Sequence, residues 1–118
     1  MPSEKGTHAL TRPERLALQA DFKTVFSEGV RIRADKFDIR YRLRQDMNIS
    51  RLGLSVSRAV GMATLRNTLK RMTREWFRLN KHRFKPSVDL VFCLRSVFKK
   101  ADVLSFRKKI EEMLKPIL

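Results

Sequence analysis

The residues best suited to chemistry in this chain are the basic side chains of the run RAVGMATLRNTLKRMTREWFR, at positions 58–78. A helix would align four of them on one face, since they recur every four residues: Arg66, Lys70, Arg74 and Arg78. Between positions 51 and 85 there are ten lysine or arginine residues and one acid, Glu75, which can pair with Arg71 or Arg78. Arginine forks match phosphate oxygens, so the pattern indicates a surface that binds a polyanion.

Other kinds of chemistry have weaker support. The acidic residues are scattered along the chain, without the tight carboxylate cluster that a two-metal nuclease needs. His8 and His82 have no acid or base partner nearby in the sequence, and His82 is expected to face solvent or contact a phosphate. There is no zinc-ligand spacing and no glycine-rich phosphate loop. We therefore predict a binding subunit with no catalytic residue and no metal site of its own.

Composition narrows the class of protein. A chain of 118 residues that is 42% hydrophobic suits a single domain over 1–118, with residues 1–10 expected to be flexible. The net charge of +15 favours a polyanionic partner, with nucleic acid as the first candidate and an anionic membrane surface as the second. The lone Cys93 is expected to be a buried thiol in a reducing compartment. The sequence has neither a secretory signal nor a membrane-spanning stretch, so we expect a cytoplasmic protein without a membrane partner.

Hydrophobic periodicity predicts the elements that precede the basic run. A capping box with an early proline at Thr11–Glu14 should begin a helix that stops at Gly29. Its apolar stripe comprises Leu18, Phe22, Val25 and Phe26. Period-two alternation predicts strands at 37–43 and 52–56, joined as a hairpin with one apolar face. The opposite, wet face would carry Arg40, Arg42, Ser55 and Ser57.

The pattern becomes helical after Gly61. An apolar stripe should pack this helix on the sheet: Leu65, Leu69, Met72 and Trp76. The segment SVDLVFCLR is apolar on both sides, which predicts a central strand. A last helix, ending at Pro116, would turn five apolar residues inward: Val103, Phe106, Ile110, Met113 and Leu114. The predicted order is α-β-β-α-β-α, an α/β (α+β) domain whose mixed sheet packs against helices.

The basic run and its surroundings closely resemble the signature of the bacterial ribonuclease P protein subunit. The matching residues are Arg66-Asn67, Lys70-Arg71, Arg74-Glu75 and Phe77-Arg78, preceded by Gly53-Leu-Ser-Val-Ser57 and Gly61. The first predicted helix adds Asp21-Phe22, Val25-Phe26 and Gly29, so the resemblance extends from Leu16 to about Met113. Two positions depart from the family pattern, because Ala59 and Thr68 stand where the family often has a basic residue.

The resemblance implies a cofactor of a catalytic RNA. The family's holoenzyme hydrolyses one phosphodiester to remove the 5′ leader of precursor tRNA, with Mg²⁺ ions bound largely by the RNA. The implied partners are the ribonuclease P RNA subunit and precursor tRNA, with no protein partner required. The implied fold is that of the second domain of ribosomal protein S5, with a left-handed β-α-β crossover around the basic helix. The general handedness rule would predict the opposite hand.

The resemblance also implies where the RNA binds. The RNA-contacting surface would comprise Arg58, Arg66, Asn67, Lys70, Arg71, Arg74 and Arg78. Phe22 and Phe26 would line the leader cleft, where their rings can stack on single-stranded bases, although core packing is the alternative for both. Arg40 and Arg42 are further cleft candidates from strand alternation alone. Asn67 either caps the start of the helix or hydrogen-bonds a sugar or phosphate.

Two other functions are open at this point. A structural RNA-binding protein of the ribosomal type would share the charge and the fold, and would have no effect on precursor-tRNA cleavage. A protein-only nuclease would cleave RNA with magnesium alone, and the scattered acids weigh against it.

Overall fold

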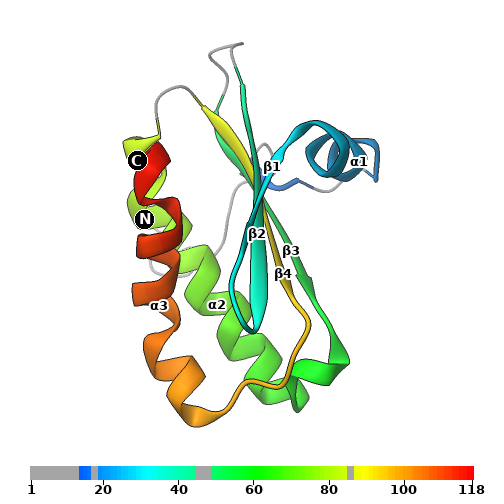
Figure 1. The fold of residues 1–118 in the computed structure, drawn as a ribbon, viewed down its shortest axis with the longest axis vertical. Coiled ribbons are helices and arrows are strands. Elements are labelled where there is room, and N and C mark those ends of the chain that lie inside the picture. The colour runs from blue at the N-terminus through cyan, green and yellow to red at the C-terminus, as the bar shows by residue number, and fades with distance from the viewer. Residues whose placement is uncertain (1–13, 17–18, 45–48, 85–86) are drawn as a thin grey trace, which may run out of the picture.

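The computed structural model describes residues 14–16, 19–44, 49–84 and 87–118 (Figure 1). Its helices and strands are, in chain order, α1 (Gln19–Glu28), β1 (Val30–Arg33), β2 (Phe37–Leu43), β3 (Arg51–Val56), α2 (Ala63–Asn80), β4 (Val88–Leu94) and α3 (Lys100–Leu114). Short 3-10 turns at Arg58–Val60 and Lys81–Arg83 flank α2. None of the helices within these ranges is both long and apolar enough to cross a membrane.

The strands form one mixed sheet in the order β1-β2-β4-β3. β2 pairs antiparallel with both β1 and β4, whereas β3 and β4 run parallel. All seven residues of β4 are buried, which confirms the central strand predicted from an apolar pattern on both sides. β3, α2 and β4 form the β-α-β unit to which the expected left-handed crossover refers, and its hand stays a prediction.

The main core lies between the sheet and the pair α2 and α3, which cover one face of it (Figure 1). Ile39, Leu52 and Phe92 point into this core from three different strands. The predicted stripe of α2 and the inward residues of α3 all belong to it or pack against it, so both predictions are confirmed. Phe77 and Thr73 of α2 are also fully buried, and the predicted stripe lacked them.

A smaller core holds α1 on the opposite face of the sheet (Figure 1). Val25 of α1 packs there with Leu16, Val91 and Cys93, and the ring of Phe22 lies against the same cluster. The predicted buried thiol is confirmed, and burial raises the pKa of Cys93. The face that was predicted to be wet is therefore partly covered by a helix.

Three expectations about the strands and the first helix were wrong. β2 and β3 do not form a hairpin, because β4 lies between them in the sheet. The predicted order lacked β1, which is only four residues long and carries exposed arginines at Arg31 and Arg33. The helix expected to run on from Thr11–Glu14 is interrupted at Arg15 and Leu16, which are not helical, since Arg15 pairs in parallel with Leu52 of β3; α1 is Gln19–Glu28.

Some expectations for the N-terminal region lie outside the described residues: the flexible tail at 1–10, His8, the cap at Thr11 and Leu18. The predicted stop at Gly29 is confirmed, because α1 ends at Glu28 and the Gly29 amide donates to the carbonyl of Val25 at 2.9 Å. The mixed sheet packed against helices confirms the predicted class of fold.

Candidate nucleic-acid interface

One side of α2 is cationic and has no internal counter-charge. We call this side the α2 cationic face: Arg66, Lys70, Asn67, Arg71, Arg74 and Arg78. Each of these side chains is partly or fully exposed, while Leu69, Trp76 and Phe77 on the other side anchor the helix in the core. Among the described residues, no ion pair links a basic member of this face to an acid. Neighbouring cations on this face therefore repel one another, and an anionic ligand would reduce that repulsion.

The start of this face is held by the turn before α2. The guanidinium Nε of Arg66 donates to the carbonyl of Gly61 at 3.1 Å. Gly61 has a φ of 155°, a conformation that favours glycine, and a Cβ atom there would lie 2.7 Å from Leu65 Cδ2. Arg58 is exposed in the adjoining turn, so it extends the cationic surface beyond the helix.

Glu75 forms an ion pair with Arg107 of α3, which links the two helices. One expectation for α2 did not hold. Asn67 is not the helix cap, because Met62 occupies that position and Asn67 is exposed within the helix. Its side-chain amide is therefore exposed to solvent, where a ligand could reach it.

The second candidate surface combines two rings of α1 with two arginines of β2 that contact this helix. We call it the α1 cleft: Phe22, Phe26, Arg40 and Arg42. Phe26 is 45% exposed, so core packing is excluded for this ring. Phe22 is half-buried and packs on the backbone of β3, where a Cβ at Gly53 would lie 2.8 Å from its ring carbons. Both rings line a hollow of about 720 Å³ along α1.

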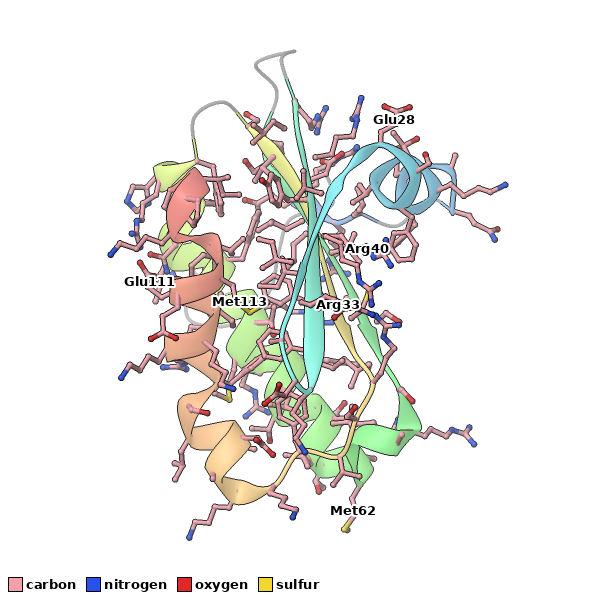
Figure 2. The ribbon with its side chains drawn as sticks, viewed as in Figure 1. Glu28, Arg33, Arg40, Met62, Glu111 and Met113 are labelled. Atoms are coloured by element: carbon pink, nitrogen blue, oxygen red, sulfur yellow. The ribbon has the colours of Figure 1, made fainter. Side chains whose placement is uncertain are left out.

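Arg40 is the cation of the α1 cleft that keeps its charge available. It extends from β2 on the side of the sheet that faces α1 (Figure 2). Its guanidinium carbon lies 4.3 Å from the centroid of the Phe26 ring, a cation–π contact. Among the described residues, its buried Nε has no hydrogen-bond partner and its guanidinium takes part in no ion pair. Arg40 is thus oriented by an aromatic ring and not neutralised by an acid.

Arg42 differs from Arg40 because it is already paired. Its Nε lies 3.4 Å from Glu28 Oε1, and its Nη1 lies 3.8 Å from Asp89 Oδ2. Asp89 is 1% exposed and also accepts from Arg44 at 3.4 Å and from Arg51 at 2.8 and 2.9 Å. Arg42 lines a separate hollow with Glu28 and Tyr41, and much of its charge is compensated.

The α2 cationic face and the α1 cleft meet at one point. Arg74 of α2 and Phe22 of α1 line the same hollow of about 180 Å³, whose floor includes Gly53 and Leu54 of β3. Phe22 also lines the larger hollow along α1. The two candidate surfaces are therefore contiguous at Arg74 and Phe22.

Similarity to known proteins identifies the family. The family model described as Ribonuclease P matches residues 10–118. The chain belongs to the ribonuclease P protein family. A ribonuclease P protein component from Thermotoga sp. (strain RQ2) is 38% identical, over 94% of this chain and 97% of the relative. The relative from Clostridioides difficile is 35% identical, over 88% and 91%.

Solved structures of the family share the fold. The Staphylococcus aureus RNase P protein aligns with a TM-score of 0.76 at 29% identity, over 87% of this chain and 94% of that one. The Thermotoga maritima RNase P protein aligns with a TM-score of 0.64 at 37% identity, over 89% and 94%. Membership makes this chain a ribonuclease P protein component with a role in processing the 5′ ends of tRNA, and favours that function over the ribosomal and protein-only alternatives.

The ribonuclease P motif thus falls on the exposed side of α2, as its spacing predicted. In the parts of the chain that the structure describes, no group of three or more His, Cys, Asp or Glu residues is placed to hold a metal. His82 is exposed in the turn after α2, as expected.

The prediction missed the ion pairs that support the α1 cleft: Asp21, Arg51 and Asp89. A signal for them was present in the run VDLVFCL, where Asp89 is the single charge of an otherwise apolar strand. A buried carboxylate needs a cationic partner, so this residue by itself indicated an arginine nearby.

Proposed function

We propose that the α2 cationic face binds the RNA subunit of ribonuclease P and that the α1 cleft binds the 5′ leader of precursor tRNA. The observation that supports this proposal is the hollow shared by Arg74 and Phe22, which joins the row of cations on α2 to the first of the two rings on α1. The row suits the phosphates of a folded RNA, and the ring suits the bases of a single strand. A cytoplasmic location, where precursor tRNA is available, goes with this proposal.

The chemistry belongs to the RNA in this proposal. Magnesium ions held largely by the RNA subunit would activate the water that hydrolyses the phosphodiester, and this chain would supply no catalytic residue. The protein would instead lower the magnesium requirement, because its net charge of +15 offsets phosphate repulsion between the RNA subunit and its substrate. It would also strengthen binding of substrates that carry a leader.

The α1 cleft would accept leaders of many sequences. Phe26 offers one face to a base and is supported on the other by the guanidinium of Arg40. Stacking of this kind depends little on base identity, since every base has an aromatic face. The guanidinium of Arg40, which takes part in no ion pair of the described residues, would attract a leader phosphate.

The test measures leader-dependent affinity of the reconstituted holoenzyme. We expect Phe26→Ala to weaken binding of precursor tRNA about tenfold, while binding of mature tRNA, which lacks the leader, stays unchanged. Leu104→Ala is the matched control, because Leu104 is an apolar side chain that is 77% exposed on α3. Equal affinity of the Phe26→Ala and Leu104→Ala proteins for precursor tRNA would overturn the proposed role of the α1 cleft.

A second experiment tests the cofactor role. Cleavage of precursor tRNA at low magnesium should require both this protein and a bacterial ribonuclease P RNA. Cleavage by the protein alone would show that it is itself a nuclease. Absence of any gain on mixing would contradict the role of the protein as a cofactor.

A further inference from the structure

Helix α1 is tied to the sheet by a chain of three charged side chains. Arg51 of β3 binds Asp89 of β4 through two hydrogen bonds, from Nε at 2.9 Å and from Nη2 at 2.8 Å. Its third nitrogen, Nη1, donates to Asp21 Oδ2 of α1 at 3.1 Å. All three nitrogens of one guanidinium are therefore used, and Asp21 connects α1 to the centre of the sheet. We call this chain the Asp21 link.

The link follows from the burial of Asp89. A carboxylate that is 1% exposed must be paired, and the sheet register places Arg42 and Arg51 directly beside it on the two neighbouring strands. Together with Arg44, three arginines surround this one acid, so the cluster carries a net positive charge. The acids that complete the balance come from α1. Asp21 lies near its start and pairs with Arg51. Glu28 lies at its end and pairs with Arg42 (Figure 2).

The link lies directly beside the proposed leader site. Asp21 precedes Phe22, whose ring rests on Gly53, two residues after Arg51 in the same strand. One helical turn further along α1, Phe26 rests on Arg40. A shift of α1 along the sheet would move both rings together, because they share one rigid helix.

We infer that Asp21 is a positioning residue for leader binding: through Arg51 and Asp89 it fixes α1 so that Phe22 and Phe26 face the leader. This inference rests on the proposed function of the α1 cleft. Asp21 itself does not contact RNA in this scheme. Its carboxylate would repel the leader phosphates, so positioning and electrostatics predict opposite changes in leader affinity when this carboxylate is removed.

The direction of the change in affinity distinguishes positioning from simple electrostatics. Loss of a carboxylate makes the protein more positive, and electrostatics alone would then strengthen RNA binding. Positioning requires the opposite result at Asp21, and only for substrates with a leader. Asp35→Asn is the matched control, since Asp35 is an exposed acid in the turn between β1 and β2, and no ion pair of the described residues includes it.

The experiment uses the holoenzyme reconstituted with a bacterial ribonuclease P RNA. We expect Asp21→Asn to weaken binding of precursor tRNA by about threefold, the effect of losing one partly exposed ion pair. Affinity for mature tRNA and for the RNA subunit should stay unchanged, and Asp35→Asn should leave precursor-tRNA affinity unchanged or slightly tighter. Precursor-tRNA affinity of Asp21→Asn that equals or exceeds that of Asp35→Asn would overturn the inference.

One further variant, together with thermal unfolding, guards against a trivial loss of folding. In Asp21→Asn the guanidinium of Arg51 still binds Asp89, so no buried charge loses its partner. Arg51→Lys breaks the link from the other side and keeps the net charge, because an ammonium cannot reproduce the fork. Both variants should show the same leader-specific loss, with thermal unfolding checked for each. A loss from Asp21→Asn with normal leader affinity in Arg51→Lys would also overturn the inference.

A double-mutant cycle with Phe26→Ala tests the route of the effect. If Asp21 acts by placing both rings of α1, Asp21→Asn should have a smaller effect in the Phe26→Ala protein, where only Phe22 is left to place. Full additivity of the two losses would contradict positioning. If Phe26→Ala itself has no leader effect, the proposed α1 cleft fails; if it has one and Asp21→Asn does not, only the positioning role fails.

Discussion

Lys70→Ala should make the protein more stable and weaken its binding to RNA. Lys70 lies in the middle of the α2 cationic face, four residues from Arg66 and four from Arg74. No ion pair or hydrogen bond within the described residues uses its ammonium, whereas Arg66 also supports the Gly61 turn. Lys70 is therefore a cleaner position than Arg66 at which to test the function of this face.

The stability gain comes from relieved repulsion. Each like-charge pair at this spacing costs about 0.2–0.5 kcal/mol, and Lys70 takes part in two of them. Alanine also has a slightly higher helix propensity than lysine. We expect the free energy of unfolding to rise by about 0.5 kcal/mol, which raises the Tm of a domain of this size by about 2 °C.

The loss of RNA binding follows from counterion release. One phosphate contact contributes about 0.9 to the slope of log affinity against log salt on a duplex, and about 0.7 on a single strand. Taking about 1 M salt as the reference, loss of one contact weakens binding about fivefold to eightfold at about 0.1 M salt. The assay is a titration of the RNA subunit with protein at several salt concentrations.

The matched control is Lys108→Ala, which removes the same side chain from an exposed position on α3. It should leave the salt slope of RNA binding unchanged. A Lys70→Ala protein with a lower Tm and an unchanged salt slope would refute the reasoning, because Lys70 would then serve the fold and not the RNA.

Two other predictions concern packing and charge. Gly53→Ala should destabilise the protein by about 1–3 kcal/mol and weaken precursor-tRNA binding, because the new Cβ would lie 2.8 Å from the Phe22 ring. Denaturant unfolding and measurement of leader affinity check this, with Ser55→Ala as the control. The hydrogen bonds from Arg83 lower the pKa of Glu111, so their contribution to stability is present above the unfolded pKa of about 4.3 and is lost as pH falls through the lower folded pKa. Glu111→Gln should therefore be less stable than the parent at pH 7 and equally stable in strong acid, and a difference that persists in acid would contradict the ion pair.

Local periodicity predicted the elements that have enough residues to show it. The stripe of α2 repeats over more than three turns, and β2 alternates over seven residues. β1 has only four residues and two exposed arginines, too short a run for a period of two to be recognised. The start of α1 was misplaced because the cap signal at Thr11–Glu14 competes with pairing of Arg15 to Leu52, a contact across more than thirty residues of chain.

Strand neighbours were beyond the reach of local patterns. Two successive strands with a short polar connection normally pair as a hairpin. Here the buried β4 inserts between β2 and β3, because a strand that is apolar on both sides gains most from the centre of the sheet. That choice depends on the burial of the whole molecule and not on the connection itself.

The sequence by itself determined the α2 cationic face. A spacing of four residues places cations on one side of any helix, whatever the helix packs against. Only the tertiary structure decided which cations stay available to a ligand. Arg40 and Arg42 are equivalent by alternation, yet Arg40 stacks on Phe26 while Arg42 pairs with Asp89 and Glu28. Ion pairs between distant segments make this difference, because a charge is neutralised by what lies near it in space and not in sequence.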